Sequence, residues 1–252
     1  MGFAAAAVLL LLQQPARDAA AAEIAAGYEA ARADPSETNV FALANRLAAA
    51  RRYPEAAKFF AFGIERYPKS ARMRVGASVA AHGEGRFDDA VDHLCNAVDI
   101  DPTDSRPLYF LGQMYDLSPS MAAEVTRRLE KFVELYPANA HARLYYAVSR
   151  AKASPDGTAA SGEIESHFAA AVRLAPRLAE AWFEFGSYLE QNGNPDRAEG
   201  KLAEAVRVDS RYRKAWYRLA MVRQRLGKPR EAAEALARFR KLGSGRESAV
   251  QK

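Results

Sequence analysis

Trp182-Phe183-Glu184-Phe185-Gly186 and Trp216-Tyr217-Arg218-Leu219-Ala220 are two versions of one pattern, and their tryptophans lie 34 residues apart. A period of this length is typical of a helix-turn-helix unit that repeats along a chain. One unit cannot bury its apolar side alone, so successive units stack into a solenoid. The pattern therefore predicts an all-α protein of stacked helical pairs, in which the period leaves no room for strands.

The same register extends backwards and defines six units, about 37–68, 69–102, 105–137, 140–176, 179–210 and 213–242. The first helix of each unit has a small residue where two helices must approach closely: Ala44, Gly76, Gly112, Ala147, Gly186 and Ala220. The second helix has a small and a large apolar residue four positions apart, as in Ala56 with Phe60, Ala90 with Leu94, Ala198 with Leu202, and Ala232 with Leu236. A proline ends four of the second helices (Pro68, Pro102, Pro137 and Pro176), and Ser210 stands at that place in the fifth unit.

These residues resemble the tetratricopeptide-repeat family over about residues 37–242. The resemblance implies a right-handed superhelical solenoid of antiparallel helix pairs, whose first helices line a concave groove. The family's tryptophan occurs only in units five and six, and the other units have Val40, Arg72, Leu108 and Arg143 instead. Because an arginine must lay its stem along the surface at this place, we expect units two and four to pack more loosely.

The N-terminal residues differ in composition from the repeats. Ala4 to Leu12 is an uninterrupted run of nine apolar residues, and Gln13-Gln14-Pro15-Ala16 follows it. This order is typical of a secretory signal peptide, although no Lys or Arg precedes Arg17. We expect residues 1–16 to be a signal peptide or N-terminal anchor. Export to the periplasm or the extracellular space is favoured over a cytoplasmic location, and a cytosolic N-terminal helix is the alternative.

Three further segments flank or interrupt the repeats. Residues 17–35 are rich in alanine, end at Asp34-Pro35, and are predicted to form an N-terminal capping helix. Residues 154–162 are a loop by composition. Residues 243–252 are predicted to be a flexible C-terminal tail, because Gly243-Ser244-Gly245 follows the last unit. Without a polar capping helix, the stripe of Leu236, Phe239 and Leu242 would be partly uncovered and would invite a partner or a second copy of the chain.

Charge is distributed unevenly. Residues 201–252 have 15 basic and 5 acidic side chains, a local charge of +10, whereas the whole chain carries +5, so residues 1–200 sum to −5. A basic third can meet an acidic protein, an anionic membrane or nucleic acid. Arginines on solvated helix faces that keep a repeat protein soluble are the simpler explanation.

The resemblance also implies which residues would contact a partner. The residue three positions before each small residue is large and apolar in all six units: Phe41, Met73, Tyr109, Leu144, Phe183 and Tyr217. Such side chains suit an extended peptide or an amphipathic helix. Asn45, Gln113 and Tyr145 complete the expected groove, and the two amides offer donors and acceptors. A role in helix packing is the alternative for the aromatic residues.

The sequence lacks the motifs of catalytic, cofactor and metal sites. His82, His93, His141 and His167 have no metal-ligand spacing, and the single cysteine, Cys95, lies on an apolar helical stripe. No nucleophile elbow, phosphate-binding loop or zinc-protease motif occurs. We therefore expect no enzyme activity, cofactor, metal or small-molecule substrate.

Two functions of different classes remain. The first is a protein-protein interaction scaffold that binds a peptide or protein segment, of unknown identity, in the concave groove. The second is a membrane-tethered or self-associating assembly factor that uses the apolar N-terminus and the basic C-terminal third. Nucleic-acid binding ranks third, because the arginines accompany no known reading motif.

Overall fold

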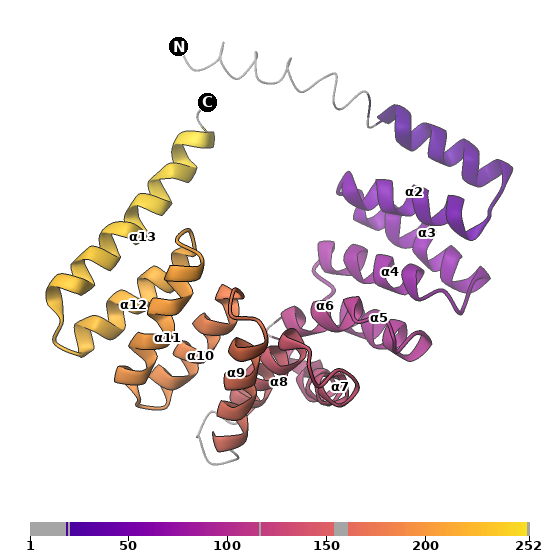
Figure 1. Ribbon diagram of the computed structural model, residues 1–252. Helices are drawn as coiled ribbons and strands as arrows, with labels where there is room; N and C mark the ends of the chain where they lie inside the picture. The colour runs from indigo at the N-terminus through magenta and orange to yellow at the C-terminus, as the bar shows by residue number, and fades with distance from the viewer. Residues whose placement is uncertain (1–18, 20, 116, 154–160, 251–252) are drawn as a thin grey trace, which may run out of the picture. The chain divides into compact units, whose positions relative to one another are not determined.

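The computed structural model describes residues 19, 21–115, 117–153 and 161–250, with side chains described up to residue 243. Helices joined by turns make up the regular secondary structure of these residues, and the expected all-α class of antiparallel helix pairs is confirmed. The chain divides into two compact units, Met1–Met121 and Ala122–Lys252. Each unit is described by itself, with the helices labelled as in Figure 1.

The first unit begins with a helical segment at residues 21–33. Its further elements are α2 (Glu37–Ala49), α3 (Tyr53–Arg66), α4 (Ala71–Gly83), α5 (Phe87–Ile100), α6 (Arg106–Met114) and the 3-10 turn η1 (Pro119–Met121). Ile24 of the first segment is buried in one cluster with Leu43 and Phe60. Its neighbour Tyr28 donates a hydrogen bond of 3.2 Å to Glu55. Residues 21–33 therefore cover the apolar edge of the α2–α3 pair, which is the role expected of a capping helix.

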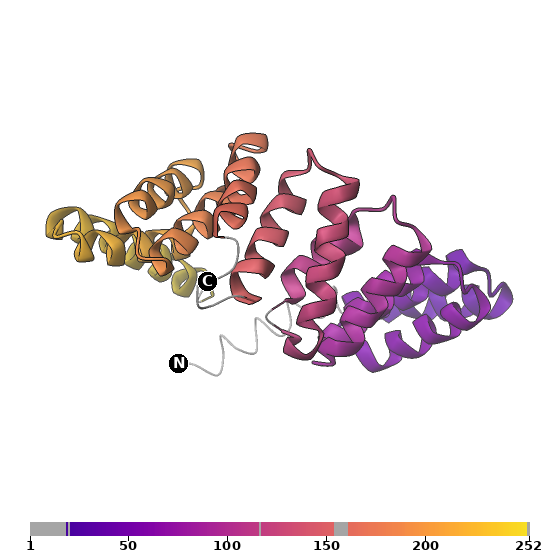
Figure 2. The same cartoon turned by 90° about the horizontal axis from the view of Figure 1, so that it is seen from below.

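The second unit contains α7 (Ala122–Leu135), α8 (Ala140–Ala153), α9 (Ser161–Leu174), α10 (Ala179–Gln191), α11 (Pro195–Val208), α12 (Arg213–Arg225) and α13 (Pro229–Val250). The helices α8, α10 and α12 each pack against the helix that follows, as Figures 1 and 2 show. Phe132, Phe168 and Leu189 are fully buried between them. The third expected hairpin, α6 with α7, is divided between the two units.

The small residues of the first helices permit close contact with neighbouring helices. A Cβ atom added to Gly76 would lie 2.2 Å from Cε1 of Phe60, and one added to Gly186 would lie 2.7 Å from Cγ of Leu202. Neither distance is compatible with van der Waals contact. Ala44, Ala147 and Ala220 are completely buried at the corresponding places. The small side chain is thus a packing requirement.

The second helices end at one common place in the repeat. The helices α3, α5, α7 and α9 end two residues before their prolines, at Arg66, Ile100, Leu135 and Leu174. Helix α11 ends at Val208, also two residues before Ser210, although no proline stands there. The carboxylate of Asp209 accepts a hydrogen bond of 2.8 Å from the backbone N–H of Arg211, as that of Asp101 does from Thr103 at 3.0 Å beside Pro102. The helix therefore ends at this place with or without the proline.

The C-terminal boundary differs from the expectation. Helix α13 continues to Val250, so residues 243–250 are helical and not an irregular tail. A glycine inside a helix costs only about 1 kcal/mol relative to alanine. The helix that these residues extend packs against α12, and such tertiary packing is the main source of helix stability in proteins. Gly243 also lies close to Arg213, whose Nη2 would be 3.1 Å from an added Cβ atom.

Other expectations lie outside the described residues or are answered in part. Residues 1–16 and most of the 154–162 loop are outside the description, which resumes with the start of α9 at Ser161. Within the described residues, no helix combines the length and apolar character that a membrane crossing needs.

Phe239 is half-buried, because the Arg213 guanidinium lies 4.1 Å from its ring centroid and the Tyr217 ring 5.2 Å away. The stripe on α13 is therefore partly covered by α12.

Candidate interaction surface

The first helices of the second unit, α8, α10 and α12, share a surface that we name the first-helix face. Residues three, four and seven positions apart lie on one side of a helix. Tyr217, Met221 and Gln224 of α12 therefore lie in a row, beside Glu190 and Gln191 at the end of α10. These residues, with Arg218 and Arg225, line a hollow of about 610 Å³. An apolar pair flanked by two amides can contact a polypeptide through both its side chains and its backbone.

Charge in the hollow is organised around Glu190. Its carboxylate accepts a hydrogen bond from Arg218 at 3.1 Å and forms an ion pair with Arg225 at 2.9 Å. The Glu190 side chain is only 9% exposed, whereas that of Arg225 is 66% exposed. One carboxylate thus holds two guanidinium groups, which leaves a net positive charge at the mouth of the hollow. A partner carboxylate or a backbone carbonyl would be attracted there.

An aromatic cluster lies beside Arg218, one of the residues that line the hollow. The Phe183 ring lies 5.0 Å from the Tyr212 ring, and the Arg218 guanidinium lies 5.8 Å from the Phe183 centroid. Burial, reinforced by the carboxylates of Glu184 and Glu180, raises the pKa of Tyr212 above its ordinary value. Tyr212 is therefore a neutral phenol at physiological pH, and the cluster holds Arg218 in position between Phe183 and Glu190.

The carboxyl group of Glu180, on α10, has a raised pKa. Burial raises the pKa of Glu180, against the opposing positive charges of His141 and Lys214. Ion pairs between repeats are present at Glu190, which pairs with Arg218 and Arg225. Lys214 acts on the pKa of Glu180 through its charge alone, without the direct contact that Glu190 makes with its two arginines.

The nine expected groove residues divide into two groups by exposure. Tyr217 is 48% exposed, Asn45 and Gln113 are exposed, and Phe41 and Tyr109 are half-buried. Phe183 and Tyr145 are buried with small exposed edges, and Met73 and Leu144 are completely buried. Met73 and Leu144 are therefore core residues and cannot present their side chains to a partner. Five of the nine belong to the first unit and four to the second.

The reason for the burial of Met73 lies in the preceding second helix. Gly63 has no side chain there, and a Cβ atom added to it would lie 2.7 Å from Sδ of Met73. The methionine fills the space that Gly63 leaves, as an unbranched thioether does readily. Sequence spacing alone could not reveal this, because the vacancy lies on another helix.

A cation also covers part of the expected surface in the first unit. The Arg72 guanidinium lies 5.2 Å from the centroid of the Phe41 ring. Nε of Arg72 also donates a hydrogen bond of 2.6 Å to Glu37. Phe41 is thus packed between α2 and α4 and offers less surface than Tyr217 does.

Met221, Gln191 and Gln224 are functional candidates that the sequence reasoning did not select. Met221 and Gln224 follow Tyr217 by four and seven residues, so helical spacing from the most exposed aromatic residue could have identified them. Gln191 becomes a candidate only because α10 ends beside α12.

Titratable groups outside the hollow do not assemble into a metal site. Among the described residues, no group of three or more His, Cys, Asp or Glu side chains could hold a metal ion. Burial and the charge of Arg74 lower the pKa of His93, and burial and the charge of Arg143 lower the pKa of His167. Both histidines are therefore neutral parts of the helix packing.

Comparisons with known proteins agree with this architecture. A tetratricopeptide-repeat family model matches residues 41–105 and 165–214. The crystal structure of YrrB, a TPR protein with an unusual peptide-binding site, is similar with a TM-score of 0.55 at 20% identity, over 75% of this chain and 95% of that chain. A tetratricopeptide repeat protein from Parabacteroides merdae ATCC 43184 is similar with a TM-score of 0.65 at 14% identity, over 90% of this chain and 88% of that chain.

A third similar structure is TTC0263, a thermophilic TPR protein in Thermus thermophilus. Its TM-score is 0.55 at 19% identity, over 73% of this chain and 100% of that chain. The sequence comparison with curated proteins gives no match. At these identities the similar structures support the fold alone. Any statement about binding must rest on the residues of the first-helix face.

Proposed function

Because the chain belongs to the tetratricopeptide-repeat family, we propose that it is a non-enzymatic scaffold that binds a peptide or protein segment on the first-helix face. The observation that carries this proposal is the hollow between α10 and α12, where Tyr217 is 48% exposed beside two arginines fixed by one carboxylate. A rigid aromatic side chain and pre-positioned guanidinium groups lower the entropic cost of binding.

The chemistry of the hollow favours a segment with an apolar side chain and an acidic or C-terminal carboxylate. Tyr217 and Met221 would contact the apolar side chain, and Arg225 would bind the carboxylate. Gln191 and Gln224 can each donate to and accept from a peptide backbone. YrrB, which shares the fold, is described as having a peptide-binding site.

A photocrosslinking amino acid at position 217 tests the proposal directly. We expect it to capture a partner in the native cell. The matched control is the same amino acid at Leu174, which is 40% exposed at the end of α9 and outside the hollow. A captured segment would then be titrated, in purified form, against the parent chain and against a variant with both Tyr217→Ala and Met221→Ala.

The expected result is a loss of affinity of at least about tenfold in the double variant, since truncating a buried aromatic contact costs on the order of 2 kcal/mol. Tyr217 is exposed and Met221 half-buried, but the Tyr217 ring lies 5.2 Å from that of Phe239, so thermal unfolding of the variant is measured first and the titration is made below its transition. Equal capture at positions 217 and 174, or equal affinity of parent and variant, would contradict the proposal. Phe183 is unsuitable for this test, since it packs against Tyr212 and its loss would disturb the fold.

Localisation is a separate proposal that rests on sequence alone. The apolar run Ala4 to Leu12 favours export. Mass spectrometry of the mature N-terminus distinguishes the alternatives. Loss of residues 1 to about 16 supports an exported scaffold, whereas an intact N-terminus supports a tether or a cytosolic form.

A further inference from the structure

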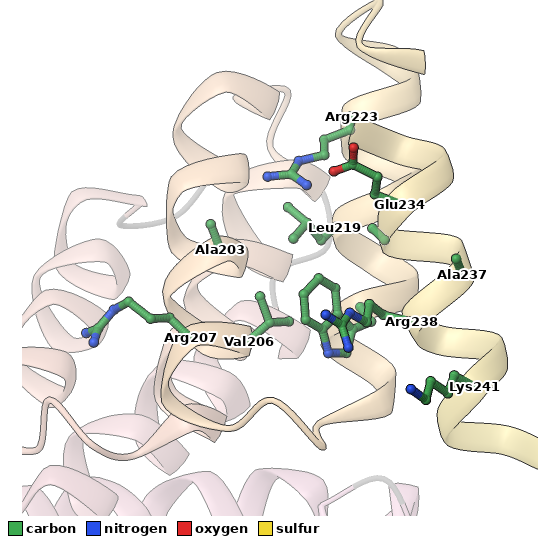
Figure 3. A pocket seen from close by; sticks show the side chains of 11 residues that line it. Ala203, Val206, Arg207, Leu219, Arg223, Glu234, Ala237, Arg238 and Lys241 are labelled. Carbon is green, nitrogen blue, oxygen red and sulfur yellow. The ribbon is translucent and has the colours of Figure 1, made fainter. Parts of the chain in front are cut away.

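A second hollow lies on the side of α12 that carries Trp216, and we name it the Trp216 groove. It is formed by α11, α12 and α13 and has a volume of about 850 Å³ (Figure 3). Its apolar lining comprises Val206, Trp216, Leu219 and Ala235. Volumes of this size are typical of sites that bind a few side chains. None of its residues lines the hollow of the first-helix face.

The residue that accompanies the tryptophan differs between two consecutive hairpins. In the preceding hairpin, Nζ of Lys201 lies 5.3 Å from the Trp182 ring centroid and covers the indole. Lys201 stands three residues after Ala198, and the corresponding residue after Ala232 is Ala235. A methyl group cannot reach across the ring as a lysine does. Trp216 is half-buried, as Trp182 is, and it lines the groove beside Ala235.

Positive charge faces the groove from α13. In Figure 3, Arg238 and Lys241 extend from α13 toward α11, whereas Arg207 points away. Arg207 forms an ion pair with Glu204 at 2.6 Å, and Arg223 pairs with Glu199 at 3.0 Å. Within the described part of the chain, Arg238 forms no ion pair or hydrogen bond. Glu234 also lines the groove, but its carboxylate lies near Arg223, at the end opposite to Lys241.

The fold does not require arginine at position 238. This residue stands six positions after Ala232, and the corresponding residues of other hairpins are Phe62, Asn96 and Glu204. Aromatic, amide and acidic side chains are all accepted at this place in the same architecture. The charge of Arg238 therefore serves no ion pair within the described residues and is available for an external one.

We propose that the Trp216 groove binds a short acidic protein segment, with an apolar side chain on Trp216 and carboxylates at Arg238 and Lys241. Apolar burial provides most of the stabilisation, and the exposed charges provide orientation. A nucleic acid fits less well, because stable binding to its backbone needs several phosphate contacts and the lining has a mostly apolar floor.

Fluorescence of Trp216 provides the test. In a Trp182→Phe chain, Trp216 is the only tryptophan, and an apolar side chain over its ring should shift its emission to shorter wavelength. The probe is a synthetic peptide in which single leucines are flanked by glutamates. The control peptide has glutamine in place of glutamate. We expect a saturable shift with the acidic peptide, weakened by salt because exposed charges are screened, and a smaller response with the control.

Two variants link the response to the groove. Arg238→Glu should weaken binding of the acidic peptide by about tenfold, since an attractive contact worth roughly twofold to fivefold becomes repulsive. Arg230→Glu is the matched control, because Arg230 is an exposed arginine of α13 outside the lining. Ala235→Lys should reproduce the covered arrangement of Trp182 and abolish the shift. Both variants are checked for parental thermal unfolding.

Several results would overturn the proposal. They are the absence of a shift with the acidic peptide, an equal shift with the glutamine peptide, or an equal loss in Arg238→Glu and Arg230→Glu. An oligonucleotide that binds more tightly than the acidic peptide in an Arg238-dependent way would assign the groove to nucleic acid. Concentration-dependent dimerisation that is lost in Ala235→Lys would assign it to a second copy of the chain. The Tyr217→Ala and Met221→Ala double variant should keep the shift, which separates this proposal from the binding proposed for the first-helix face.

Discussion

Arg143 and Trp182 make the same hydrogen bond at the same place in two successive repeats. Nε of Arg143 donates to the carbonyl oxygen of Pro137 at 3.1 Å, and Nε1 of Trp182 donates to that of Pro176 at 3.0 Å. Trp216 repeats the contact with Ser210 at 2.9 Å. In each case the acceptor lies six residues before the donor. Arginine thus takes over the donor function of tryptophan at the loop that joins two hairpins.

Replacing Arg143 tests this equivalence. Arg143→Leu keeps an apolar stem but leaves the Pro137 carbonyl without its donor, which should lower the free energy of unfolding by about 1 kcal/mol. Arg143→Trp restores a donor at the same place and should be less destabilising. Urea unfolding of the three chains measures the difference. Equal stability of the leucine and tryptophan variants would show that the hydrogen bond contributes nothing.

The glycine of α10 provides a second prediction. Gly186→Ala places a Cβ atom 2.7 Å from Cγ of Leu202, so it should destabilise the chain by about 1 to 3 kcal/mol through overpacking. Gly200→Ala is the control in the neighbouring helix α11, where an added Cβ atom meets nothing within 4 Å. It should stabilise by about 0.5 to 1 kcal/mol, because alanine loses less backbone entropy on folding. Opposite shifts in Tm are expected, and a loss of Tm in both variants would refute the packing argument.

His93 provides a prediction of pH dependence. Burial, with the nearby charge of Arg74, lowers its pKa below the ordinary value of 6.5, and its Nδ1 is buried without a hydrogen-bond partner. The unfolded chain therefore takes up this proton first as pH falls, and stability declines from about pH 6.5 toward the lower folded pKa. His93→Leu should reduce this decline in urea midpoints measured between neutral and mildly acidic pH. The same change at exposed His82 is the control, and an equal effect there would contradict the assignment.

Glu37 should act at lower pH. Hydrogen bonds from Ser70 and Arg72 lower the pKa of its carboxyl group. The stabilisation is complete above the ordinary value of 4.5 and is lost as pH falls through the lower folded pKa. Because the pair is partly exposed, its contribution is limited to about 0.2 to 1 kcal/mol. Stability of Glu37→Gln relative to the parent, measured above and below this range, should converge at the acidic end. A constant difference would exclude the carboxylate as its source.

The sequence was sufficient for the architecture. Its period predicted an all-α fold of antiparallel helix pairs, and the described helices form that fold. Repeats allow this because each hairpin contacts mainly its neighbours, so local spacing carries most of the packing information. The small residues at 76 and 186 could be interpreted in the same way, since a side chain on a helix of known register faces a known neighbour.

The residues of the candidate surface could be predicted only in part from the register of the repeat. The register predicted equal contact roles for Tyr217, Met73 and Leu144, but Tyr217 is exposed whereas Met73 and Leu144 are completely buried. The end of α13 was also misjudged, because glycine and serine composition was given more weight than the extension of an existing helix. Both errors arose where a residue's environment depends on a different segment of the chain.

Trp182 and Trp216 show which properties follow from the sequence and which follow only from the tertiary structure. Their 34-residue separation was enough to establish the repeat, because helical periodicity is a property of the chain itself. Only the tertiary structure shows that Lys201 covers one indole and that Ala235 leaves the other at the floor of a groove. Two equal letters in the sequence thus have different neighbours, because the surroundings of a side chain are decided by the residues that adjacent helices bring to the same place.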